Sequence, residues 1–120
     1  MKITRIYTDA EGETHFDEID EPDVEFRGGG AYTRQIDTYG MAFRATAAKG
    51  DEPVWGDWHT APQRQYILFL QGETEIEVSD GEKRHFKTGD VFLVEDTTGK
   101  GHRNRRIHEG PELWAQVRAN

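Results

Sequence analysis

Hydrophobic and polar residues alternate with a period of two along much of the chain, which is typical of β-strands. Thr74, Ile76 and Val78 alternate with glutamates and predict a strand with one exposed face. The stretches Ile67 to Leu70 and Val91 to Val94 are continuously apolar instead, and each predicts a strand buried on both sides. Many short strands of this kind predict an all-β sandwich or barrel.

Turn residues separate these predicted strands. Asp80-Gly81 marks a tight hairpin, and Thr88-Gly89-Asp90 marks a second turn before the next apolar stretch. Two further stretches alternate in the same way: Met41, Phe43 and Ala45 in the first half of the chain, and Leu113, Ala115 and Val117 near its C-terminus. Strands are therefore expected throughout the C-terminal two thirds of the chain.

The N-terminal third has a weaker pattern. Ile3 to Tyr7 alternates as an edge strand would, and the acidic run from Asp17 to Glu25 is interrupted by Pro22. Gly28-Gly29-Gly30 predicts a flexible joint, because it lacks the strand and helix that flank a phosphate-binding loop. With 120 residues, the chain has the length of a single domain.

Composition excludes several classes of function. The chain has no cysteine, so disulfides, thiolate nucleophiles and cysteine-ligated metals are absent. The formal net charge of -8, from 23 acidic and 15 basic residues, argues against a nucleic-acid partner. No apolar stretch has the length of a signal peptide or a membrane span, so we expect a cytoplasmic protein with no membrane partner.

Two groups of residues have the spacing of a known paired signature. The first group is His59, Ala61, Gln65 and Gly72, and the second is Gly89, Glu95, Thr97 and His102. They resemble the two motifs of the cupin superfamily, in which the first reads His-x-His, Glu, Gly and the second reads Gly, Pro-x-Gly, His. Ala61 and Gln65 stand where that family has His and Glu, and two extra residues precede His102.

The resemblance covers roughly residues 40 to 117 and implies an all-β, cupin-type double-stranded β-helix, or jelly roll. Residues 1–120 would then form one domain, with residues 1–39 as an N-terminal strand and arm. Because cupins commonly pair, the resemblance also implies a homodimer, and we expect Ile3 to Tyr7 to contribute to it. Its function would be to bind a small organic molecule, since cupins host isomerases, lyases, dioxygenases and non-catalytic binders on one scaffold.

The sequence allows three interpretations of the site. By the resemblance, His59, Gln65 and His102 could hold one divalent ion, either Mn, Fe, Ni or Zn, for isomerase, lyase or dioxygenase chemistry. The two imidazoles could instead act as proton shuttles without a metal. The third reading is a ligand-binding or sensor module without turnover.

The loop from Glu95 to Gly101 is long and polar for its place next to His102. Asp96 or Glu95 could orient the imidazole of a histidine by accepting its ring N–H, or act as a general base if partly buried. Asp96 could also only satisfy the backbone of a tight turn. If Asp96 faces a water-accessible cavity, its replacement by Asn would change the stability by no more than roughly 1 kcal/mol.

The remaining site residues are predicted from strand parity. Gln65, Ile67 and Phe69 share one face and are expected to line a ligand cavity, with Trp55 as a lid over it. Arg103 and Arg105 share the opposite face from Asn104. They would form either a solvated outer surface or an anion-steering patch at the mouth of the site.

Overall fold

The computed structural model describes residues 1–47, 50 and 54–120. Within these residues the elements are strands: β1 (Lys2–Thr8), β2 (Thr14–Asp20), β3 (Asp23–Arg27), β4 (Gly30–Thr33), β5 (Thr38–Thr46), β6 (Gln65–Gln71), β7 (Glu73–Val78), β8 (Lys83–Lys87), β9 (Val91–Val94), β10 (His102–Arg106) and β11 (Glu112–Ala119). The described part contains no helix long and apolar enough to cross a membrane.

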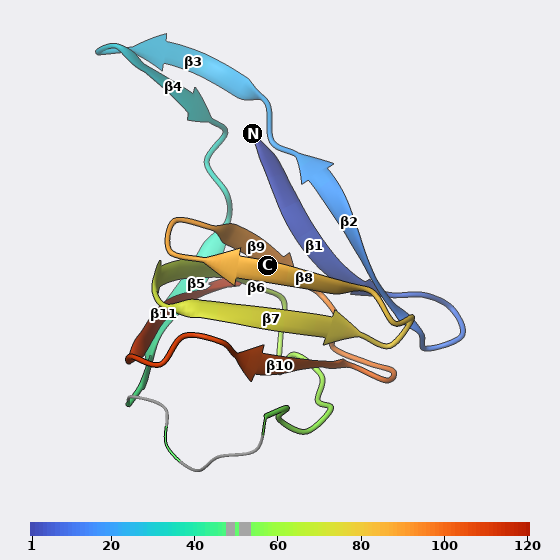
Figure 1. The fold of residues 1–120 in the computed structure, drawn as a ribbon. Coiled ribbons are helices and arrows are strands. Elements are labelled where there is room, and N and C mark those ends of the chain that lie inside the picture. Colours follow the sequence, from blue (N-terminus) through green and yellow to red (C-terminus); the bar gives the residue numbers. More distant parts are fainter. Residues whose placement is uncertain (48–49, 51–53) are drawn as a thin grey trace.

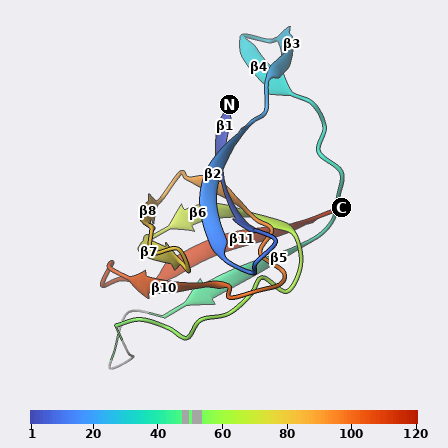
Figure 2. The same cartoon turned by 90° about the vertical axis from the view of Figure 1, so that its right-hand side faces the viewer.

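Two sheets face each other and enclose the main core (Figures 1 and 2). One has the strand order β2-β1-β9-β6-β11-β5, and the other has the order β10-β7-β8. Aromatic rings fill the space between them, with the centroid of Phe92 4.4 Å from Phe86 and that of Phe69 5.1 Å from Trp114. The alternation of β7 is confirmed, since Thr74, Ile76 and Val78 are buried.

The two apolar stretches of the sequence lie side by side as β6 and β9, paired antiparallel with Ile67 opposite Phe92. Burial on both faces holds for β9, where Phe92, Leu93 and Val94 are all buried. The same prediction is wrong for the end of β6, because Leu70 is 44% exposed on the outer face of the sheet. The outer face is covered around Tyr66 and left open farther along the strand.

The N-terminal strand lies inside the larger sheet. β1 pairs antiparallel with β2 and parallel with β9, so the interpretation of Ile3 to Tyr7 as an edge strand is wrong. Ile6 contacts the core between the sheets, and Ile3 packs on the outer face with Leu93. Both backbone edges of β1 are occupied, which leaves it no free edge for exchange with another chain.

Residues 23–33 form a hairpin arm that projects away from the two sheets (Figure 1). Gly28 and Gly29 have φ angles of 57° and 78°, the left-handed backbone that a two-residue hairpin turn requires. The predicted flexible joint is therefore a tight turn between β3 and β4. The arm leaves Val24 and Phe26 exposed to solvent.

The free edge of the larger sheet beyond β11 is β5, and its apolar residues point outward. Met41 and Phe43 are 60% and 62% exposed, whereas Arg44, on the opposite face, lies over the ring of Trp114. An exposed apolar strand edge is a surface on which another chain can pair. The homodimer stays a prediction, with β5 rather than β1 offering the surface for it.

A histidine links the start of β2 to two loops. Nε2 of His15 lies 2.6 Å from Oδ2 of Asp9, and Nδ1 lies 2.7 Å from Oδ2 of Asp80. The hydrogen bonds to Asp9 and then to Asp80 raise the pKa of His15 above its ordinary value of 6.5. The bond to His15 lowers the pKa of Asp9 below its ordinary value of 3.8.

These shifts predict a pH window of maximal stability. A raised histidine pKa stabilises the fold below pH 6.5 and stops doing so as the pH rises through the folded-state pKa, while a lowered Asp9 pKa stabilises it above pH 3.8. We expect the free energy of unfolding in urea to fall as the pH rises above neutrality, and His15→Gln to flatten this dependence. His85→Gln, on β8, is the control. An unchanged pH profile in His15→Gln would contradict the prediction.

Candidate functional site

Two backbone hydrogen bonds bring the histidines of the two motifs together. The amide of His59 donates to the carbonyl of His102 at 2.9 Å, and the amide of His102 donates back at 2.8 Å. His59 is thus part of a β-bridge to β10 and lies outside the strand that holds Gln65. A Cβ at Gly101, where φ is 76°, would lie 2.2 Å from the carbonyl oxygen of His59. Only glycine allows this close approach.

Each imidazole is fixed by a hydrogen bond at Nδ1. Nδ1 of His59 lies 2.9 Å from the carbonyl of Asp57, and Nδ1 of His102 lies 2.6 Å from Oδ2 of Asp96. Because both partners are acceptors, Nδ1–H donates in each case, and Nε2 of each neutral ring carries a lone pair. The ring centroids are 4.5 Å apart. The pair therefore offers two proton acceptors within one small space.

Asp96 is completely buried, which corrects the expectation of a turn carboxylate facing water. One oxygen accepts from His102, and Oδ1 has no hydrogen-bond partner among the described protein atoms. The backbone carbonyl of Asp96 accepts from the amide of Ala61, so the loop also holds the first motif in place. Glu95 instead points to Arg5 and Arg64 and has a structural role.

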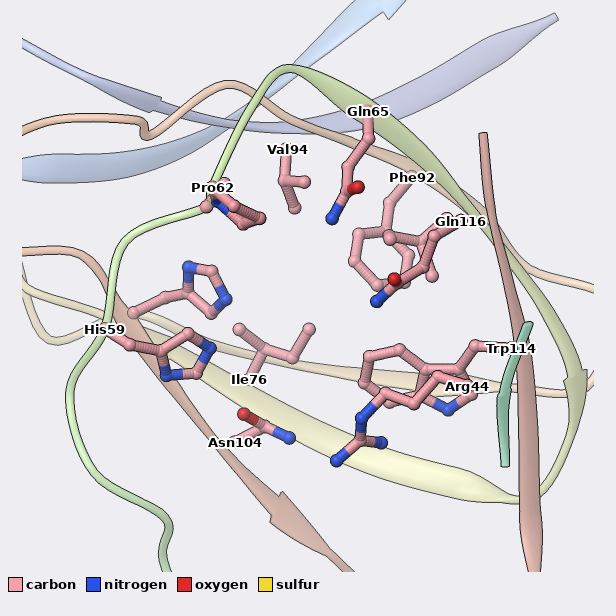
Figure 3. A pocket seen from close by; sticks show the side chains of 13 residues that line it. Arg44, His59, Pro62, Gln65, Ile76, Phe92, Val94, Asn104, Trp114 and Gln116 are labelled. Carbon is pink, nitrogen blue, oxygen red and sulfur yellow. The ribbon is translucent and has the colours of Figure 1, made fainter. Parts of the chain in front are cut away.

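The histidines open onto a cavity of about 250 Å³ between the two sheets (Figure 3). One wall is apolar, and polar side chains enter from several strands. The described lining residues are Arg44, His59, Ala61, Pro62, Gln65, Ile67, Ile76, Phe92, Val94, His102, Asn104, Trp114 and Gln116.

The structure brings some of the predicted site residues together and separates others. Gln65 and Ile67 line the cavity with the two histidines, as strand parity predicted. Phe69 has the same parity but lies deeper, where its ring packs against Trp114 and does not reach the cavity. Trp55 is not a lid, because its ring lies outside the cavity against the guanidinium groups on β10.

The arginines of β10 follow the predicted parity. Arg103 and Arg105 point outward, and Asn104 between them lines the cavity. Arg103 pairs with Glu77 at 2.6 Å, and Arg105 pairs with Glu75 at 2.8 Å. Because carboxylates neutralise both cations, the interpretation of an anion-steering patch is wrong.

Arg44, Asn104 and Gln116 were not expected at the site from the sequence. Asn104 could have been found from its parity, since it alternates with two arginines that face solvent. Arg44 has the opposite parity to the apolar residue Phe43, so the alternation along this stretch gives no reason to place it at a cavity. The pairing of β5 with β11, which sets Arg44 opposite Trp114, has no local signal.

The donor atoms at the histidine end do not fit a bound divalent ion. Protein metal sites of this type use three or more ligands, commonly with a charged oxygen. Among the described residues, no three His, Cys, Asp or Glu side chains are placed to hold a metal. Ala61 has no donor, Gln65 is neutral, and the carboxylate of Asp96 is already bonded to Nδ1 of His102.

The fold is similar to that of two solved structures. An RmlC-like cupin family protein with a double-stranded β-helix fold, from Methanocaldococcus jannaschii, matches with a TM-score of 0.50 and 15% identity, over 79% of this chain and 86% of that chain. The Cnp3 cupin domain of Schizosaccharomyces pombe matches with a TM-score of 0.51 and 12% identity, over 99% and 84%. No protein-family model and no curated protein matches the sequence.

These likenesses establish the fold. The described residues form the double-stranded β-helix of the cupins, which confirms the all-β class and the jelly-roll architecture expected from the two motifs. At this level of identity the likeness carries no activity, so the function must be argued from the cavity itself.

The Asp96–His102 contact predicts a specific imidazole tautomer. In the native protein, ¹⁵N NMR should find His102 protonated at Nδ1 and bare at Nε2. Asp96→Asn should shift His102 toward the Nε2–H form, because the Asn amide can donate to Nδ1. We expect this change to cost about 1–3 kcal/mol of stability, since it alters a buried charged hydrogen bond.

Glu95→Gln is the matched control, because it removes a neighbouring carboxylate that does not touch His102. Its imidazole signals should resemble those of the native protein. A native His102 that is already protonated at Nε2, or an Asp96→Asn protein with an unchanged tautomer, would show that Asp96 does not orient the ring.

Proposed function

We propose that the protein binds a small organic molecule in this cavity and exchanges a proton with it through His59 and His102. The observation that carries the proposal is the pair of imidazoles whose Nδ1 atoms are both engaged. Their Nε2 atoms are the groups left for chemistry at the cavity end. Proton transfer at a carbon next to a carbonyl group, as in an isomerase or a lyase, uses positioned acids and bases of this kind.

The environments of the two histidines differ in a way that suits two roles. His102 is 8% exposed, and its Nδ1 is held by a buried carboxylate. His59 is exposed to solvent and is held only by a backbone carbonyl. In the proposed function, His102 takes a proton from the ligand, and His59 exchanges protons with water.

Deuterium exchange tests this function without knowledge of the natural ligand. The protein is incubated in D₂O with a panel of small 2-oxo acids and neutral ketones, and loss of the α-proton signal is followed by ¹H NMR. We expect faster exchange than in buffer for at least one compound, and a loss of at least about tenfold in His59→Gln, in line with the usual contribution of a general acid or base.

His85→Gln should retain the native exchange rate, because His85 lies on β8 outside the cavity. Binding of a panel compound without any exchange would leave a non-catalytic ligand-binding module as the function. Exchange that persists unchanged in His59→Gln would overturn the role of this imidazole.

A metal titration separates this proposal from the metal-dependent alternative. A ligand that binds only the folded state raises the melting temperature by mass action. We expect Mn²⁺, Fe²⁺, Ni²⁺ and Zn²⁺ to leave the melting temperature of the untagged native protein within experimental error. Gln65→Glu adds a carboxylate beside the two histidines and should gain a metal-dependent increase. A saturable increase in the native protein that disappears in His59→Gln would favour the metal site.

A further inference from the structure

The cavity has an unusual charge for this chain. The sequence holds 23 acidic residues and has a formal net charge of -8, yet none of the described lining residues is acidic. The lining includes one guanidinium, from Arg44, together with two imidazoles and three amides. The interior of the site is therefore complementary to an anion, although the protein as a whole is an anion itself.

Arg44 differs from most arginines of the chain in having no carboxylate partner among the described residues. The arginines with such partners are Arg5, Arg27, Arg34, Arg64, Arg84, Arg103 and Arg105. Burial raises the pKa of Glu112, with Arg106 and Arg44 acting in the opposite direction, but no ion pair joins Glu112 to Arg44. The planar donor fork of Arg44 is thus available to a carboxylate from outside the protein.

The position of Arg44 is set by its neighbours. Its guanidinium carbon lies 4.8 Å from the ring centroid of Trp114, its partner residue across the β5–β11 ladder. Stacking on an aromatic face holds the guanidinium group in place and leaves the N–H donors, which lie in the guanidinium plane, unoccupied. Figure 3 shows the side chain of Arg44 reaching the cavity on the side opposite His59.

Amide side chains that lack protein partners surround the same space. Gln65, Gln116 and Asn104 point into the cavity (Figure 3), and none of these side chains hydrogen-bonds another described residue. Gln65 is only 5% exposed, and buried polar groups normally have a partner. A bound ligand with oxygen atoms would supply the missing acceptors.

The size and walls of the cavity restrict the rest of the ligand. A volume of about 250 Å³ lies below the range of roughly 300–1,000 Å³ that is usual for drug-sized ligands. The apolar part of the lining consists chiefly of Ile67, Ile76, Phe92, Val94 and Trp114. These side chains favour a compact hydrocarbon or aromatic body.

We propose that the ligand is a small organic carboxylate whose anionic group is bound by Arg44 while its reacting carbon faces His59 and His102. The placement of the reacting carbon at His59 and His102 rests on the proposed function, whereas the binding of the carboxylate by Arg44 does not. Arg44 is a binding residue that selects the charge of the ligand, and the apolar wall accepts its body. Neutral molecules of the same shape lack the group that Arg44 recognises.

Matched pairs of carboxylates and amides test the proposal. Acetate, 2-oxobutanoate, benzoate, phenylacetate and phenylpyruvate are compared with their neutral amides by NMR titration of the protein. The Nε–Hε signal of Arg44 and the indole N–H signal of Trp114, which also lines the cavity, are followed in the native protein, and the Trp114 signal is followed in Arg44→Gln. We expect at least one carboxylate to bind about tenfold or more tightly than its amide, as for a charge-assisted pair. Arg44→Gln should remove this preference.

Arg118→Gln is the control, because it removes the same charge from an exposed residue of β11 outside the cavity lining. It should keep the native preference for carboxylates. The proposal is overturned if no carboxylate in the panel shifts the Arg44 signal at millimolar concentration, or if Arg44→Gln binds carboxylates as well as the native protein does.

The two proposals fail in different ways. His59→Gln should lose proton exchange and keep carboxylate binding, since His59 lies across the cavity from Arg44. Carboxylate binding without exchange in the native protein would refute the acid–base function and leave the anion site intact. Exchange of neutral ketones at the same rate as 2-oxo acids, unaffected by Arg44→Gln, would refute the anion site alone.

Discussion

The reciprocal backbone bridge between His59 and His102 is the constraint on which the site depends. It joins a segment outside the regular strands to the first residue of β10, and it requires a bare backbone at Gly101. Two side chains far apart in the sequence thereby acquire a fixed separation. The bridge uses main-chain groups, so it does not depend on which residues occupy positions 61 and 65. The relative position of the two histidines is therefore set by the backbone.

Charge is distributed so that the acidic excess stays away from the cavity. Glu75 and Glu77 lie on the outer face of the smaller sheet, where they neutralise Arg103 and Arg105. The ring of Trp55 stacks on the same two guanidinium groups on the outside of this sheet. Asp96, whose carboxylate lies behind His102, is buried and bonded to Nδ1 of that histidine. A cavity in a strongly acidic protein can in this way remain attractive to an anion.

Local patterns in the sequence predicted the architecture and part of the site. Motif spacing identified the fold, and parity along a strand placed Gln65 and Ile67 in the cavity, because the side-chain period is a property of the backbone. Parity does not tell how deeply a side chain is buried. Phe69 shares the face of Gln65 and Ile67, but its ring packs in the core between the sheets and does not line the cavity. Arg44 depended on long-range pairing between β5 and β11, which no local pattern encodes.

The burial of Asp96 makes the histidine pair directional for protons. With no exposed surface, its carboxylate offers no path to bulk water behind His102. A proton held on Nε2 of His102 can leave only through the cavity, either back to a bound molecule or across to the exposed His59. When a ligand fills the cavity, return of the proton to that ligand competes with its transfer to His59. Exchange with solvent at this site therefore passes through His59, and internal transfer between neighbouring atoms of one ligand competes with it.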